Sequence, residues 1–247
     1  AEQMPAGLAL EEIITWGCEF AKNDQQDTLS ELGIYFDTWF SEKSMIDNGE
    51  IDRVLANLAE KGMAYEKDGA TWLSSVEFGD DKDRVLIKSD GEYTYLTPDV
   101  AYHRNKFERS DWLINVWGAD HHGYIARMKA AMQALGYRSD ALTVQVTQLV
   151  KLLRAGEEVK LSKRQGDIIE LRSIIEEIGA DATRFMYLLQ SVDSKQTFDL
   201  ELAASQAMDN PVYYVQMAYA RLCSIERNAN EHGFDFEILP IDQLSVL

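Results

Sequence analysis

DWLINVWGADHHGYIARMKAAMQALG, residues 111–136, decides the fold class of this chain. The run up to Gly118 is apolar in the way of a buried strand. The residues after Gly123 then place four apolar side chains on one side of a helix: Ile125, Met128, Met132 and Leu135. TVQVTQLV, residues 143–150, again has strand character. Strand, helix and strand in this order predict a parallel α/β unit.

A helix and two hairpins are expected upstream of this unit. The apolar residues between Glu50 and Lys61 fall on one helical face, and Gly62 is placed to end the helix. Asp68-Gly69 and Asp90-Gly91 then each lie between residues of strand character. Asp-Gly pairs favour tight hairpins because both positions tolerate positive φ.

The chain downstream of about Leu200 is expected to be helical. Before it, Ser173 and Glu176 have the spacing of a capping box, in front of the helical pattern IIEEIG. A further helix is expected through ATRFMYLLQ, and Pro211 suits the first turn of a later one. The architecture therefore passes from α/β to all-α.

Composition narrows the functional classes. The 247 residues carry a formal net charge of -18 and two cysteines, Cys18 and Cys223, which form no C-x-x-C pair. A disulfide scaffold and thiolate-bound zinc are therefore disfavoured. The acidic total disfavours broad attraction to nucleic acid but leaves room for a local basic site. With no signal-like N-terminus and no apolar run of membrane-spanning length, a cytoplasmic protein is expected.

The end of the strand at Gly118 is a candidate ligand site. Ligands of open parallel sheets bind where the strands end and helices begin. Gly118 and Asp120 could hold a nucleotide there, although an exposed turn with Asp120 as a helix cap is the alternative. His121 and His122 raise the question of a metal, but neighbours in sequence seldom chelate one ion and no third ligand is spaced nearby. No metal site is expected.

A basic segment is the second candidate. The window from Lys151 to Arg164 has a local charge of +3 in an acidic chain, and four of its residues could contact a triphosphate: Lys160, Ser162, Lys163 and Arg164. Such a loop could neutralise the charge that develops when an α-phosphate is attacked. A solvated surface loop is the alternative from charge pattern alone. Neither G-x-x-x-x-G-K-[ST] nor G-x-G-x-x-G occurs.

Longer motifs carry a resemblance to a known family. KLSKR at 160–164 looks like the KMSKR signature of class I aminoacyl-tRNA synthetases, with Leu161 in place of Met. Four further segments resemble the bacterial arginyl-tRNA synthetases, in the order of that family: YTYLTPDVAYH, WGADHHGYIARMKAAMQALGY, DATRFMYLLQS and NPVYYVQMAYAR. The resemblance extends over nearly the whole chain.

The resemblance implies a reaction and a site. The family activates L-arginine with ATP to arginyl-adenylate and transfers it to tRNA(Arg). A guanidinium is well recognised by a carboxylate with an aromatic or hydroxyl partner. Asp99 and Tyr95 match the family positions for this task, with His121 beside both substrates. Without the resemblance, Asp99 would be taken as a helix N-cap and Tyr95 as a strand residue.

ATP is expected to bind along the strand ends and the basic loop. The resemblance implies Gly118, Asp120, His121 and His122 on one side, and the backbone of Leu149 and Val150 at the adenine. Lys160, Lys163 and Arg164 are expected to be catalytic, with Ser162 also on the phosphates. ATP would bring Mg²⁺ as its counter-ion, with no tightly bound cofactor. Positioning and charge stabilisation suffice because the attacking carboxylate needs no general base.

The domain organisation follows from the same resemblance. Residues 1–200 are expected to form the C-terminal half of a Rossmann-like catalytic domain, with a helix and hairpin insertion around 30–92 and the KMSKR-type loop at 160–164. Residues 201–247 are expected to begin an α-helical anticodon-binding domain. The upstream H-x-G-H motif of the family has no counterpart among the four histidines, so the chain is expected to be a piece of a larger, monomeric synthetase.

Two other functions compete with this interpretation. One is a synthetase paralogue without the H-x-G-H half, acting as a regulatory module that binds arginine or tRNA. The other is a class I synthetase or related nucleotidyltransferase for another amino acid. A purely structural helical adaptor would leave the ordered motifs unexplained.

The first prediction concerns catalysis by the chain alone. Arginine-dependent ATP–pyrophosphate exchange, assayed with tRNA(Arg) present, should give no turnover, because the H-x-G-H motif that helps to hold the ATP phosphates is missing. Robust exchange would refute the claim that an essential half is absent.

Overall fold

The chain forms two compact units. A computed structural model describes residues 7–154, 156–159 and 169–234. One unit, here called the α/β unit, comprises Phe36–Leu149 and Ser191–Lys195. The other, the helical unit, comprises Ala1–Tyr35, Val150–Gln190 and Gln196–Leu247. Within the described ranges, no helix combines the length and the apolar character that crossing a bilayer requires.

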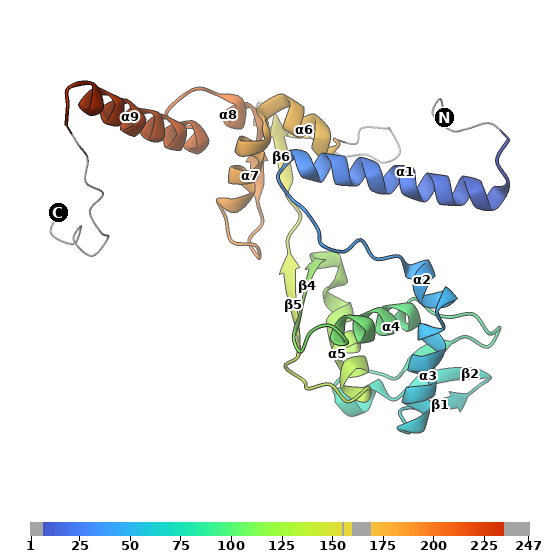
Figure 1. Cartoon of the computed structure of the whole chain (residues 1–247). Coiled ribbons are helices and arrows are strands. Elements are labelled where there is room, and N and C mark those ends of the chain that lie inside the picture. Colours follow the sequence, from blue (N-terminus) through green and yellow to red (C-terminus); the bar gives the residue numbers. More distant parts are fainter. Residues whose placement is uncertain (1–6, 155, 160–168, 235–247) are drawn as a thin grey trace. The chain divides into compact units, whose positions relative to one another are not determined.

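The α/β unit begins with helices and an antiparallel sheet (Figure 1). These elements are α2 (Glu42–Asp47), α3 (Glu50–Glu60), β1 (Ala64–Lys67), β2 (Ala70–Leu73), a 3-10 segment η1 (Ser75–Phe78) and β3 (Arg84–Ile87). The strand order is β1-β2-β3. Asp68 and Gly69 join β1 to β2 with φ of 53° and 73°. The predicted helix and first hairpin are confirmed, and α2 was not predicted.

The second Asp-Gly pair makes a different turn from the one predicted. Lys88 N–H donates to the Glu92 carbonyl at 2.8 Å and Gly91 N–H to the Lys88 carbonyl at 2.9 Å. This is a three-residue loop in which Gly91 has φ 85° and Asp90 does not have positive φ. Such loops need one left-handed residue, which Gly supplies. Beyond it the pairing is an isolated bridge between Ile87 and Tyr93.

The parallel α/β element that the sequence predicts is confirmed. It consists of β4 (Leu113–Gly118), a 3-10 segment η2 (Ala119–Tyr124), α5 (Ile125–Ala134) and β5 (Leu142–Thr147). The two strands run parallel and end together, with Gly118 opposite Thr147. A 3-10 segment therefore separates the strand from the helix, where the sequence predicted an immediate helix start.

Helix α4 (Leu96–Phe107) precedes β4 and packs against α5 and α3. Its Leu96 and Val100 belong to the main core of this unit, together with Leu58, Leu86 and Met128. These side chains are at most 4% exposed. Burial of each such side chain stabilises the fold by roughly 1.5–3 kcal/mol.

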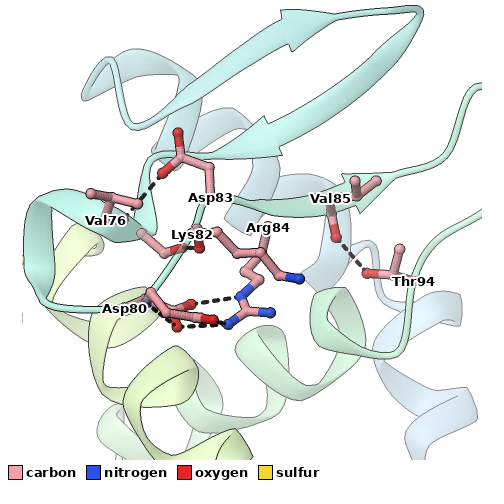
Figure 2. A network of polar contacts seen from close by, with 9 residues as sticks. Val76, Asp80, Lys82, Asp83, Arg84, Val85 and Thr94 are labelled. Atoms are coloured by element: carbon pink, nitrogen blue, oxygen red, sulfur yellow. Dashed lines mark hydrogen bonds and ion pairs between the residues drawn. The ribbon is translucent and has the colours of Figure 1, made fainter.

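A polar network fastens the segment between η1 and β3, as Figure 2 shows. The Arg84 guanidinium donates to both carboxylate oxygens of Asp80 at 2.7 Å, and it also pairs with Asp81. Ser75 donates to the Lys82 carbonyl at 2.8 Å, and Asp83 accepts from the Val76 N–H at 3.1 Å. Because Asp80 is buried, this bidentate pair holds a loop that has few apolar residues of its own.

The helical unit has its own core. Its elements are α1 (Leu10–Glu31), β6 (Lys151–Arg154), β7 (Glu157–Glu158), α6 (Leu171–Ile178), α7 (Ala180–Leu188), β8 (Thr197–Asp199), α8 (Leu200–Ala204) and α9 (Pro211–Glu231). Strand β6 pairs antiparallel with β7 and parallel with β8. Leu152, Ile174, Phe198 and Leu200 form the core. Pro211 lies in the first turn of α9 as predicted, with Asn210 as its N-cap.

Three features of this unit differ from the sequence prediction. Ser173 lies inside α6, where its hydroxyl donates to the Glu170 carbonyl at 2.7 Å, so the predicted capping box is wrong. The helix predicted through AASQAMDN is the short α8, which ends at Ala204. Helix α1 was not predicted; none of its residues is buried, so its amphipathic signal is weak.

The buried ion pair of Figure 2 leads to a stability prediction. Asp80→Ala should lower the free energy of unfolding at pH 7 by about 3 kcal/mol, because it leaves the nearly buried Arg84 without its main partner. Hydrogen bonding to Arg84 holds the pKa of Asp80 well below its ordinary value. This contribution is thus present above the unfolded pKa of about 3.9 and is lost as the pH falls. Urea unfolding measures both effects.

Asp140→Ala is the matched control. It removes a carboxylate from the exposed Arg138–Asp140 pair and should leave the free energy of unfolding almost unchanged. Equal losses in the two variants, or a deficit of Asp80→Ala that does not shrink at pH 3, would contradict the structural role of the buried pair.

Candidate active site

Asp99 lies in the first turns of α4, which are tied to strand β3. Thr94 donates to the Val85 carbonyl at 2.7 Å (Figure 2), and Thr97 donates to the Leu86 carbonyl at the same distance. Pro98 is tolerated in this first turn because the N–H groups there have no partner within the helix. The sequence alternatives for this segment are wrong: Asp99 is inside the helix rather than at its N-cap, and Tyr95 is not in a strand.

The Asp99 carboxylate is held from the end of β4. Tyr124, the last residue of η2, donates its hydroxyl hydrogen to Asp99 Oδ2 at 2.8 Å. The Tyr124 ring packs against Trp117, with 5.8 Å between ring centroids, and the Arg127 guanidinium lies 4.9 Å from its centroid. The hydroxyl therefore approaches Asp99 from a ring that its neighbours hold in place.

Burial and hydrogen bonding act in opposite directions on Asp99. Burial raises the pKa of this carboxyl, whereas the Tyr124 hydrogen bond and the charges of Lys106 and His121 lower it. Burial, followed by the Asp99 charge, raises the pKa of Tyr124 well above its ordinary value. Tyr124 therefore stays a donor throughout the neutral range. A partly buried carboxylate with so few compensating donors is suited to a cationic ligand.

The other two predicted arginine-binding residues, His121 and Tyr95, differ in their relation to this carboxylate. His121 lies in η2, with its ring 6.4 Å from that of Trp117, and its charge acts on Asp99. Tyr95 is 91% exposed and belongs to the turn of α4 that precedes Asp99. Tyr95 and Pro98 line a hollow of about 550 Å³ with Tyr93, Glu92 and Ile46. The described residues that line this hollow do not include Asp99.

The predicted nucleotide residues of the α/β unit lie at the end of β4 and after β5. Gly118 is the last residue of β4 and the N-cap of η2, and a Cβ there would come within 2.6 Å of Asp120 Oδ1. Asp120 is exposed and lies 3.6 Å from His121 Nε2; it makes no capping hydrogen bond to η2. His122 is exposed as well. Leu149 follows β5 with its side chain 82% exposed.

The remaining predicted residues lie elsewhere or outside the described ranges. Val150 belongs to the helical unit, where it packs against the core around Leu152. Lys160, Ser162, Lys163 and Arg164 lie outside the described residues. In the described ranges, no three His, Cys, Asp or Glu side chains gather in a way that could hold a metal ion.

A buried polar row behind Asp99 was missed by the sequence reasoning. His103 donates from Nδ1 to the Asp99 carbonyl at 2.7 Å, and its Nε2 is 2.6 Å from Asn115 Nδ2. Lys106 donates to Asn115 Oδ1 at 2.9 Å. The spacing of Asp99, His103 and Lys106 at i, i+4 and i+7 places them on one helical face, which was the available signal.

Comparisons with known proteins match this chain to one family. Residues 12–236 match the family model described as the catalytic domain of tRNA synthetases class I (R). Arginine–tRNA ligase 1 of Halalkalibacterium halodurans is 55% identical over 210 residues, which cover 85% of this chain and 38% of that protein. The arginine–tRNA ligase of Anoxybacillus flavithermus is 52% identical over 223 residues, covering 90% of this chain and 40% of that protein.

Solved structures show the same fold. A crystal structure described as an arginyl-tRNA synthetase of Campylobacter jejuni superposes with a TM-score of 0.80 at 38% identity, covering 92% of this chain and 50% of that one. An arginyl-tRNA synthetase of Thermus thermophilus, at 19% identity and a TM-score of 0.66, supports the fold alone. The chain spans about 40% of the length of the curated relatives that it matches.

The fold is thus that of a class I synthetase catalytic domain, with a parallel strand pair that ends at the candidate site. Within that class, the chain belongs to the family described as tRNA synthetases class I (R). This is the arginyl family that the sequence motifs resemble.

The Tyr124 contact leads to a prediction about Asp99. Tyr124→Phe should raise the pKa of the Asp99 carboxyl, because it removes a hydrogen bond that favours the ionised form. The measurement is a pH titration of ¹³C-labelled aspartate carboxyls by NMR, with Asp99 assigned from Asp99→Asn. Tyr102→Phe is the control, since it keeps the ring over which Lys106 lies. An Asp99 titration that is unchanged in Tyr124→Phe would remove Tyr124 from the site.

Proposed function

We propose that the chain carries the arginine-binding part of an arginine–tRNA ligase. The ligase joins L-arginine to tRNA(Arg) with ATP, through an arginyl-adenylate, and releases pyrophosphate and then AMP. The observation that carries this proposal is the carboxylate of Asp99, partly buried at the start of α4 and held on one oxygen by Tyr124. The relatives named above as arginine–tRNA ligases support it.

A guanidinium is the cation that suits this carboxylate best. Its planar N–H groups can donate to a carboxylate in pairs, and it stays charged at all physiological pH values. Tyr124 restricts Asp99 Oδ2 to one orientation, so the carboxylate is prepared for a ligand before the ligand arrives. Tyr95, one helical turn before Asp99, would contribute an exposed aromatic ring to the binding of the guanidinium. Lysine would fill the same charge requirement without the paired hydrogen bonds.

ATP is proposed to bind where β4 and β5 end. Gly118, Asp120, His121 and His122 would border its ribose and phosphates, and the backbone at Leu149 and Val150 its adenine. Lys160, Lys163 and Arg164, together with Ser162, would neutralise the phosphates and the charge that develops as pyrophosphate leaves. Mg²⁺ would enter as the counter-ion of ATP, and no step here is assigned to a metal held by the chain.

The arginine carboxylate would attack the α-phosphate once both substrates are aligned. No general base is needed, so the contribution of the chain would be positioning and charge stabilisation. The same reading proposes tRNA(Arg) as the partner, a cytoplasmic location and a monomeric parent enzyme. It also proposes the division into a catalytic part, 1–200, and the start of an anticodon-binding part, 201–247.

Calorimetry with L-arginine tests the proposed site. Asp99→Asn should weaken arginine binding by at least about tenfold, because a neutral amide replaces the charge-assisted acceptor. L-citrulline, which has the shape of arginine but no charge, should bind the unaltered chain at least about tenfold more weakly, and so should L-lysine.

Asp111→Asn is the control because it removes the same charge from an exposed position. It should leave arginine affinity unchanged. Equal arginine affinity in Asp99→Asn, or equal binding of citrulline, would exclude Asp99 as the guanidinium partner.

A further inference from the structure

The polar row behind Asp99 has a fixed direction of donors and acceptors. The Asp99 carbonyl can only accept, so His103 Nδ1 carries the hydrogen of this contact. The Lys106 ammonium can only donate, so the amide oxygen of Asn115 faces it and the amide nitrogen faces His103. His103 Nε2 is then the acceptor, and the imidazole is neutral. Each member of the row therefore specifies the orientation of the next.

The two connecting residues of this row are buried. His103 and Asn115 are 4% and 6% exposed. Burial is the main reason why the pKa of His103 is lowered to about 4, with the Lys106 charge as a second cause. The His103 ring also packs against those of Tyr102 and Trp117. A neutral imidazole thus links helix α4 to strand β4 throughout the neutral pH range.

Lys106 is the charged end of the row. Its ammonium lies 4.6 Å from the centroid of the Tyr102 ring and is bonded to Asn115. Neither partner is an anion, which is unusual for a half-buried lysine. A side chain on a helix leans towards the N-terminus, so Lys106 extends in the direction of Asp99, two turns earlier. Asp99 is the carboxylate whose charge acts on it.

We propose that Lys106 is the resident counter-charge of Asp99, held in place by Asn115, His103 and Tyr102, so that the carboxylate is ionised before a cationic substrate binds. This proposal deepens the proposed function and rests on it for the identity of the substrate. Lys106 is a positioning residue, because it acts through Asp99 and is not assigned a contact with arginine.

The other charged groups around the pair are few. Tyr124 and His121 of η2 face Asp99, and Arg127 of α5 lies on the Tyr124 ring. The positive charge of Arg109, which follows α4, contributes to lowering the pKa of Lys106. From α3, Glu50 is paired with Arg104. Burial lowers the pKa of Lys106 to about 8, which is far above the range in which carboxyls titrate. Lys106 is therefore charged whenever Asp99 gains or loses its proton.

Substitutions at Lys106 test the proposal without arginine. Lys106→Gln keeps a polar group for Asn115 but removes the charge, and Lys106→Arg keeps the charge. The carboxyl titration of Asp99, followed by ¹³C NMR on the whole chain, should move to higher pH in Lys106→Gln and stay in place in Lys106→Arg. Lys106→Met should reproduce the Gln result. If it does not fold, the Gln and Arg variants still decide the question.

The affinity for L-arginine at two pH values is the second test of the proposal. In Lys106→Gln the dissociation constant for L-arginine at pH 5 should rise about threefold more than it does at pH 7.5, because the neutral fraction of Asp99 grows at low pH. In Lys106→Arg both values should remain as in the unaltered chain.

The outcomes separate the two claims. A purely structural role for Lys106 would lower the stability of the variants and leave the Asp99 titration unmoved, which would overturn the proposal. If the Asp99 titration moves as expected but the unaltered chain does not bind arginine, the counter-charge is supported and the proposed substrate of the site is refuted.

Discussion

The carboxylate of Asp99 owes its position to a helix start that is hydrogen-bonded to a neighbouring strand. Thr94 and Thr97 bind the first turn of α4 to carbonyls of β3, and Tyr124 reaches the carboxylate from the end of β4. A carboxylate removed from water is costly unless donors or a cation compensate it. This energetic constraint links the fold to the proposed function, in which a cationic substrate would complete the compensation of Asp99.

The same constraint explains why the surroundings of Asp99 are polar but sparsely charged. His103 and Asn115 are neutral, and their hydrogen bonds connect α4 to β4 without adding charge beside Asp99. Lys106 supplies a cation at a distance, so it favours ionisation of Asp99 without filling the place of a ligand. A closer cation would form a closed ion pair, and arginine would have to displace it. Lys106 thus favours the ionised form of Asp99 without pairing directly with its carboxylate.

The sequence predicts the elements whose signals are local. The strand up to Gly118, the helix behind it and the turn at Asp68 follow from periodicity and turn chemistry over fewer than a dozen residues, and the structure confirms them. Ser173 is not the cap because the helix starts at Leu171, with Glu170 in the N-cap position. Helix α1 was not predicted because none of its residues is buried and they form almost no apolar stripe.

In the candidate site, too, only residues within local motifs could be identified from the sequence. Asp99 and His121 could be selected from motifs, but the row from Lys106 to Asn115 joins residues of two elements, and only tertiary packing brings them together. A crystal structure of the chain with L-arginine bound is the decisive experiment. If Asp99 is the guanidinium partner, two guanidinium nitrogens should lie about 3 Å from its carboxylate, with the Tyr124 contact retained. Arginine bound elsewhere, with Asp99 contacted only by Tyr124, would contradict this assignment.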